Sequence, residues 1–231
     1  EHASCFMPAE FKNLGVDEVV RKSHVAWDPG ALAVAEGMAA MLDGTLVAGQ
    51  VSRLIYDCNR PPEAPDAMPD RSEVFDIPGN AGLSAAERDR RVAVVYRPFQ
   101  TALQSAIASL QSPVVVTIHS FTPVYKGENR ATEIGALHDV DSRLADAMLD
   151  LAPHFTDANV QRNQPYGPEN GVTHTLREHA IAAGHLNVML EIRNDLIDTA
   201  PQQEAMAKLL AVWVARASTQ AGAEGDVQCK S

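Results

Sequence analysis

Three segments of the chain end in residues that can bind an anion or assist hydrolysis. They are Asp57-Cys-Asn59-Arg60, His119-Ser120 and Glu191-Ile-Arg193. The arginine fork fits a carboxylate bidentately, and a neighbouring asparagine adds another donor. Imidazoles bind zinc, while a carboxylate accepts the proton of an attacking water. Together these residue types indicate metal-assisted amide hydrolysis of an anionic substrate, although each segment alone is also compatible with a capped strand end.

Apolar runs precede all three segments. Residues 51–56, 113–118 and 186–192 have the composition of buried strands, with 113–118 as a central one, and residues 45–48 predict a further short strand. In open parallel sheets, ligands collect at the carboxyl ends of the strands. We therefore expect the three segments to lie at one edge of a sheet.

Helical patterns alternate with these strands. They cover residues 31–42, 84–110, 141–151, 173–183 and 201–217. Ser84 and Glu87 form a capping-box pattern, and Pro98 is expected to kink or interrupt its helix. Residues 61–83 are rich in Pro, Asp and Gly and predict a functional loop. The alternation predicts an α/β fold with a mostly parallel or mixed central sheet and helices on both faces.

Composition limits the classes of protein that the chain can belong to. Its 231 residues are 45% hydrophobic, which predicts a single domain over residues 1–221 with a polar tail at 222–231. The net charge of −11 argues against nucleic-acid binding, which needs a basic surface. Three scattered cysteines indicate no disulfide framework and predict a cytoplasmic protein. No run is long enough to predict a membrane span.

Several motifs occur in a characteristic order over nearly the whole chain. They are Glu1-His-Ala-Ser4, His24-Val-Ala-Trp-Asp-Pro-Gly-Ala31, Ser52-Arg-Leu-Ile-Tyr-Asp-Cys-Asn-Arg-Pro61, Ile118-His-Ser-Phe-Thr-Pro123, Asn163-Gln-Pro-Tyr166 and Glu191-Ile-Arg-Asn-Asp-Leu196. With these motifs in this order, the chain resembles the N-formylglutamate amidohydrolase family. The resemblance implies a phosphorylase/hydrolase-like fold, related to the zinc-dependent carboxypeptidases and to aspartoacylase, and one bound divalent metal, expected to be zinc. Because a site motif opens the chain, we also expect a strand upstream of Glu1.

The resemblance also implies a set of metal ligands. His2 and His119 correspond to the histidine ligands. The wider clan pairs its first histidine with a glutamate three residues later, but Cys5 stands at that position. We expect Asp28 to supply the carboxylate instead, with Glu10 as a second candidate. Cys5 itself is expected to be a buried thiol rather than a ligand.

The remaining site residues are expected to bind and convert the substrate. Asn59 and Arg60 correspond to a clamp for a substrate carboxylate, and Glu191 corresponds to the general base. Arg53 is expected to stabilise the oxyanion, and Arg193 to bind a second carboxylate. Two further residues are expected to line the substrate pocket, namely Asn163 and Tyr166.

These assignments predict a hydrolase that cleaves a small anionic acyl amino acid. The expected substrate is N-formyl-L-glutamate, cleaved to formate and L-glutamate as in histidine degradation. One alternative is a carboxypeptidase-like hydrolase of a peptide or cell-wall fragment. Another, suggested by Cys5, is a catalytically inactive relative that binds a carboxylate.

Overall fold

Two compact units make up the chain. The computed structural model describes residues 1–225 and residue 229. The first unit comprises Glu1–Pro29 and Val47–Ala106, and the second comprises Gly30–Leu46 and Ile107–Ser231. The predicted single domain over residues 1–221 stays a prediction. The predicted polar tail at 222–231 lies partly outside the described residues. No helix in the described part of the chain is long and apolar enough to cross a membrane.

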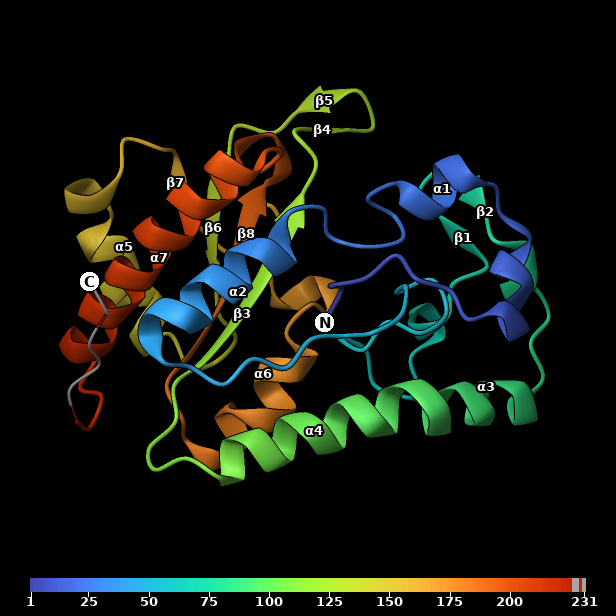
Figure 1. Cartoon of the computed structure of the whole chain (residues 1–231), viewed down its shortest axis with the longest axis horizontal. Coiled ribbons are helices and arrows are strands. Elements are labelled where there is room, and N and C mark those ends of the chain that lie inside the picture. Colours follow the sequence, from blue (N-terminus) through green and yellow to red (C-terminus); the bar gives the residue numbers. More distant parts are fainter. Residues whose placement is uncertain (226–228, 230–231) are drawn as a thin grey trace. The chain divides into compact units, whose positions relative to one another are not determined.

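A four-stranded mixed sheet forms the centre of the second unit (Figure 1). Its strands are β3 (Val115–Phe121), β6 (Ile134–Leu137), β7 (Val160–Arg162) and β8 (Asn187–Arg193), in the order β3-β8-β6-β7. β3 pairs with β8 in parallel and β6 with β7 in parallel, whereas β6 and β8 are antiparallel. The predicted α/β fold with a mixed sheet is confirmed. The expectation that β3 is central is wrong, because it is an edge strand of the described sheet.

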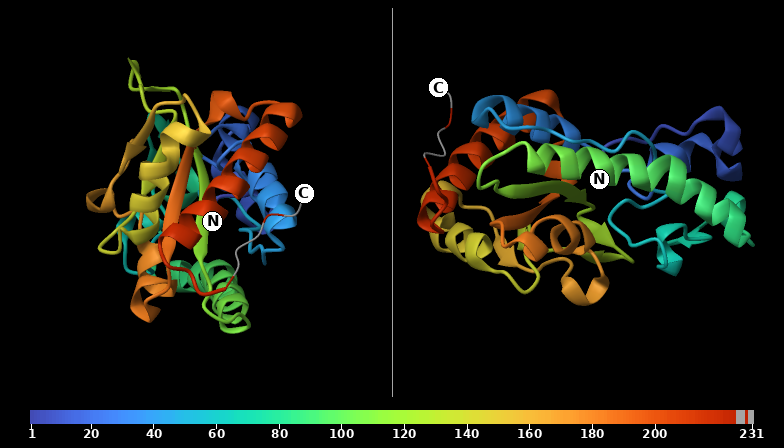
Figure 2. Two further views of the ribbon diagram at one scale, coloured as in Figure 1. Left: turned by 90° about the vertical axis from the view of Figure 1, so that its left-hand side faces the viewer. Right: turned by 90° about the horizontal axis from the view of Figure 1, so that it is seen from below.

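Helices cover both faces of this sheet. On one face, alternate β8 side chains such as Leu190 belong to a core shared with α2 (Ala31–Leu42), α5 (Arg143–Phe155) and α7 (Ala200–Gln220). Within this layer α2 and α7 pack against each other (Figure 2). On the other face, Met189 joins a smaller cluster with α6 (His174–His179). Since successive strand residues point to opposite faces, the buried run of β8 serves both cores.

Short elements complete the second unit and build most of the first. A two-stranded hairpin, β4 (Val124–Tyr125) and β5 (Glu128–Asn129), follows β3. The first unit contains α1 (Glu18–Lys22), α3 (Ala85–Arg91) and the strands β1 (Arg71–Ser72) and β2 (Phe75–Asp76), and α4 spans Arg97–Ala108. Short 3₁₀ segments are Ala9–Gly15, Pro65–Ala67, Pro78–Asn80, Pro168–Asn170, Ile181–Ala183 and Asn194–Leu196.

The helix predicted over residues 84–110 is interrupted, as expected, near Pro98. Ser84 and Glu87 form the predicted capping box. A π-helical turn, Val92–Tyr96, separates α3 from α4. Proline lacks an N–H and its ring clashes with the carbonyl four residues earlier, so the turn widens just before it.

Two predicted strands are wrong. Residues 45–48 and 51–56 form no strand. Leu54, Ile55 and Tyr56 are fully buried, so the apolar run correctly signals a core position. Its backbone nevertheless makes turn-like bonds, for example from Ile55 N–H to the Ser52 carbonyl at 3.0 Å. An apolar run of this length reports burial without fixing the type of element.

Candidate active site

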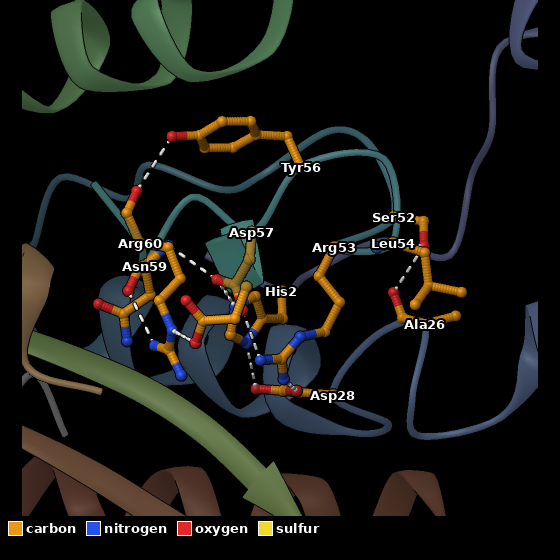
Figure 3. Close-up of polar contacts among 11 residues, drawn as sticks. His2, Ala26, Asp28, Ser52, Arg53, Leu54, Tyr56, Asp57, Asn59 and Arg60 are labelled. Atoms are coloured by element: carbon orange, nitrogen blue, oxygen red, sulfur yellow. Dashed lines mark hydrogen bonds and ion pairs between the residues drawn. The ribbon is translucent and has the colours of Figure 1, made fainter. Parts of the chain in front are cut away.

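The Asp57–Arg60 segment is a tight turn and not the tip of a strand (Figure 3). Arg60 N–H donates to the Asp57 carbonyl at 3.0 Å, and Asn59 N–H donates to Asp57 Oδ1 at 2.9 Å. The Tyr56 hydroxyl donates to the Arg60 carbonyl at 3.1 Å. An aspartate that bonds to the backbone two residues later is a typical turn-forming element. The carboxylate of Asp57 therefore organises the turn that carries Asn59 and Arg60.

Buried side chains replace the missing sheet partners of this segment. Asn80 donates through Nδ2 to the Leu54 carbonyl at 2.8 Å. Arg91 donates to the Ile55 carbonyl at 3.1 Å and to Asn80 Oδ1 at 2.6 Å. Burial lowers the pKa of the Arg91 guanidinium from its usual value. Because buried carbonyls need donors, this pair satisfies a backbone that has no neighbouring strand.

His2 lies between two carboxylates of the same unit. Its Nε2 is 2.7 Å from Asp57 Oδ1, and its Nδ1 is 3.3 Å from Asp28 Oδ2. All three side chains are buried, and Asp28 N–H also donates to the His2 carbonyl at 2.9 Å. Two ligand atoms of a tetrahedral zinc site lie about 3.3 Å apart when the bonds are about 2.0–2.1 Å long. His2 Nδ1 and Asp28 Oδ2 fit that spacing, while Asp57 holds the opposite nitrogen as a carboxylate does in many metal sites.

Arg53 bridges the two carboxylates around His2. One of its terminal nitrogens is 2.6 Å from Asp57 Oδ2, and the other is 3.6 Å from Asp28 Oδ1. Burial disfavours the charged form of Asp57, but the positive charge of Arg53 and the hydrogen bond with His2 hold the pKa of this carboxyl well below its usual range. Asp57 is therefore a permanent anion at neutral pH.

Arg60 is also paired in the structure. Its Nε is 2.7 Å from Asp66 Oδ2, and its guanidinium is mostly shielded while Asp66 is exposed. Asp66 belongs to the predicted loop over residues 61–83. The guanidinium thus already binds one carboxylate, which is the class of ligand that the sequence predicts for it.

His119 and Glu191 are direct neighbours in the second unit. They are register partners on the parallel strands β3 and β8, and both are buried. Paired residues of adjacent strands point to the same face, and the strands lie about 4.8 Å apart. Gly135 of β6 flanks Glu191 on its other side, where a Cβ atom would collide with the Gln164 carbonyl. The expectation that these two segments meet at the carboxyl ends of parallel strands is confirmed.

The other predicted residues of this unit have structural partners. Arg193 donates to Asp195 Oδ1 at 2.8 Å and to Glu133 Oε1 at 3.3 Å. The hydrogen bond to Asp195 and the negative charge of Asp195 raise the pKa of the Arg193 guanidinium. Asn163 has a left-handed φ of 47° and accepts from His138 N–H at 2.9 Å. Arg193 and Asn163 therefore both bond to neighbouring residues of this unit.

The sequence model of the N-formylglutamate amidohydrolase family matches residues 1–198. The chain belongs to this family. It is similar to the crystal structure of gene product Atu2144 from Agrobacterium tumefaciens, with 54% identity and a TM-score of 0.92, over 95% of this chain and 88% of that one. It also shares its fold with the N-formylglutamate amidohydrolase from Ralstonia eutropha JMP134, with 19% identity and a TM-score of 0.56, over 80% of this chain and 79% of that one. No curated protein matches the chain.

In this family member, each unit brings together part of the predicted site. The first unit groups His2, Asp28 and Arg53, and the second unit pairs His119 with Glu191. Glu10, the second candidate for the metal carboxylate, instead forms an ion pair with Arg90. Sequence reasoning assigned no role to Asp57, although it stands two residues before Asn59 in the motif that carries the family resemblance.

Proposed function

We propose that the chain hydrolyses N-formyl-L-glutamate to formate and L-glutamate as a metal-dependent amidohydrolase. Membership of the family over residues 1–198 supports the reaction class. The observation that supports metal dependence is the buried hydrogen-bonded group of Asp57, His2 and Asp28. The 3.3 Å between His2 Nδ1 and Asp28 Oδ2 fits two ligands of one tetrahedral ion. We further propose that the fold is related to that of the zinc carboxypeptidases.

We propose His2, Asp28 and His119 as the metal ligands. When bound, zinc would polarise the acyl carbonyl and acidify a water. Asp57 keeps His2 in one tautomer and one orientation, because it bonds to the ring nitrogen opposite Asp28. Arg53 balances the charge of the two aspartates and is proposed to stabilise the oxyanion as well.

Glu191 is proposed to move the proton. Its carboxylate takes a proton from the attacking water as the new C–O bond forms, and it returns that proton to the departing amide nitrogen as the C–N bond breaks. Its buried position beside the proposed metal ligand His119 supports this role.

Asn59 and Arg60 are proposed to bind the α-carboxylate of the substrate. Arg60 is shielded and already binds the carboxylate of Asp66, which supports its affinity for this group. Tyr166 is proposed to line the pocket. The substrate is therefore a small anionic acyl amino acid, in keeping with a cytoplasmic enzyme of histidine degradation that binds neither nucleic acid nor membrane.

Metal content and formate release test this proposal together. Protein purified without chelator is analysed for metals and assayed with N-formyl-L-glutamate before and after zinc is added. We expect one equivalent of zinc and formate release that a chelator abolishes. Asp28→Asn should lower both readouts, whereas Asp146→Asn on α5, which removes the ion pair with Arg162 and weakens the hydrogen bond from the Ser142 hydroxyl, should lower neither. Zinc binding without turnover of formyl or other acyl amino acids would instead favour the inactive carboxylate-binding relative.

A further inference from the structure

An aromatic cage surrounds the guanidinium of Arg130 in the second unit. The guanidinium carbon lies 4.5 Å from the ring centre of Tyr125, 5.1 Å from that of Tyr166 and 5.4 Å from that of Phe121. The side chain donates to the Tyr166 hydroxyl at 3.0 Å and to the Thr122 carbonyl at 3.3 Å. Rings stacked against a guanidinium fix its plane and reduce its contact with water.

No carboxylate pairs with Arg130 among the described residues. Its two hydrogen bonds go to neutral oxygens, and its positive charge is half-buried. The neighbouring Arg193 differs, because it binds both Asp195 and Glu133. A partly desolvated cation without an anion is unfavourable unless a ligand supplies one. Arg130 keeps three of its five N–H donors for such a ligand.

The cage lies on the face of the sheet that carries His119 and Glu191. Phe121 follows His119 by two residues, so both point to the same face, about 7 Å apart. Tyr166, another ring of the cage, packs against the cluster that contains Met189, which precedes Glu191 by two residues on that face. Ring contacts with Phe121 and Tyr166 therefore hold Arg130 at the level of the His119–Glu191 pair.

We infer that Arg130 binds the side-chain carboxylate of an N-acyl dicarboxylic amino acid and determines specificity for it. This inference rests on the proposed function and gives the second-carboxylate role to Arg130 in place of Arg193. The cage orients the guanidinium so that its remaining donors meet a carboxylate in one plane. Such a carboxylate would balance the positive charge of Arg130, which no carboxylate among the described residues balances.

Paired substrates test the inference. We expect wild-type protein to have a far higher kcat/KM for N-formyl-L-glutamate than for N-formyl-L-glutamine, which lacks the charge. Arg130→Gln should lower kcat/KM for the glutamate substrate on the order of 100-fold, since a charge-assisted bond is lost, and leave that for the glutamine substrate nearly unchanged. Arg130→Lys should be intermediate, because it keeps the charge without the fork. Loss of the preference in Arg193→Gln but not in Arg130→Gln would overturn the inference.

A binding measurement separates this inference from the proposed function. Calorimetry with L-glutamate and L-glutamine needs no turnover, and melting curves establish that each variant is folded. If wild-type protein hydrolyses no formyl amino acid yet binds L-glutamate through Arg130, only the proposed reaction fails. If wild-type protein binds L-glutamate no better than L-glutamine, or Arg130→Gln binds both as wild type does, the specificity role of Arg130 is excluded. Arg143→Gln, which breaks the pairing with Asp141 and a hydrogen bond to the Gly184 carbonyl, is the matched control.

Discussion

Asp57 illustrates how one buried carboxylate serves several partners. Its Oδ1 contacts His2 and the Asn59 N–H, while its Oδ2 pairs with Arg53. The proposed metal ligand, the proposed oxyanion residue and the turn that carries the clamp thus share one anion. A change at Asp57 should therefore affect metal binding and substrate binding together.

Asp139 offers a test of pH dependence. Burial opposes its ionisation, but hydrogen bonds from Thr173 and Arg177, both at 2.5 Å, lower its pKa. The pKa of an aspartate in the unfolded chain is about 3.9, so this network contributes its full stabilisation above that pH. The stabilisation is lost as the pH falls through the lower folded pKa.

We expect Asp139→Asn to lower the free energy of unfolding by about 1–2 kcal/mol at pH 7. The difference from wild type should shrink on acidification below about pH 4. Urea unfolding between pH 3 and pH 7 measures both effects. A difference that stays constant over this range would show that the charge of Asp139 is not the cause.

At the scale of elements, close packing between α2 and α7 depends on a glycine. A Cβ atom added at Gly37 would lie 2.7 Å from the Cβ of Ala207, which is closer than side chains pack. Gly37→Ala should therefore destabilise the protein by about 1–3 kcal/mol, although alanine is the better helix former by about 1 kcal/mol. Adding Ala207→Gly should recover most of this loss. Thermal unfolding of both single variants and the double variant measures the coupling, and additive losses would contradict the predicted contact.

Helices were predictable from this sequence because caps and periodicity mark them locally. The capping box at Ser84 and the break near Pro98 are both present. The conformation of residues 51–56 was not predictable, because the groups that bond to their backbone are side chains distant in sequence. Asn80 and Arg91 bond to the carbonyls that a neighbouring strand would otherwise bind, and no local pattern signals this arrangement.

At the scale of the whole molecule, folding and metal binding should be linked. An ion that binds only the folded chain adds about 2.7 kcal/mol of stability at 100 times its Kd. Zinc should therefore raise the Tm of metal-free protein. Asp57→Asn should need roughly 10–100-fold more zinc for the same shift, since the carboxylate that orients His2 is lost. Scanning calorimetry over a zinc series measures this, with Asp146→Asn as control, and equal zinc responses in all three proteins would contradict the orienting role of Asp57.

The candidate site was predictable only where it follows from strand order. The rule for parallel strands correctly paired His119 with Glu191. It gave no role to Asp57, which acts from a turn, or to Arg130, whose cage combines residues from the end of β3, the β4–β5 hairpin and the segment after β7. Residues that several loops bring together have no regular spacing in the sequence by which they could be recognised.

The irregular backbone before Asn59 and Arg60 also has an evolutionary consequence. Inserting one residue into a strand turns every following side chain to the opposite face. The segment at 52–60 has no such register, because turns and the side chains of Asn80 and Arg91 hold it. An inserted or deleted residue there would change the spacing between Arg53, Asp57 and Asn59, but it would leave the register of the strands that carry His119 and Glu191 unchanged. Changes of length at 52–60 should therefore alter the proposed clamp and the partner of the proposed metal ligand His2 without rebuilding the strand order.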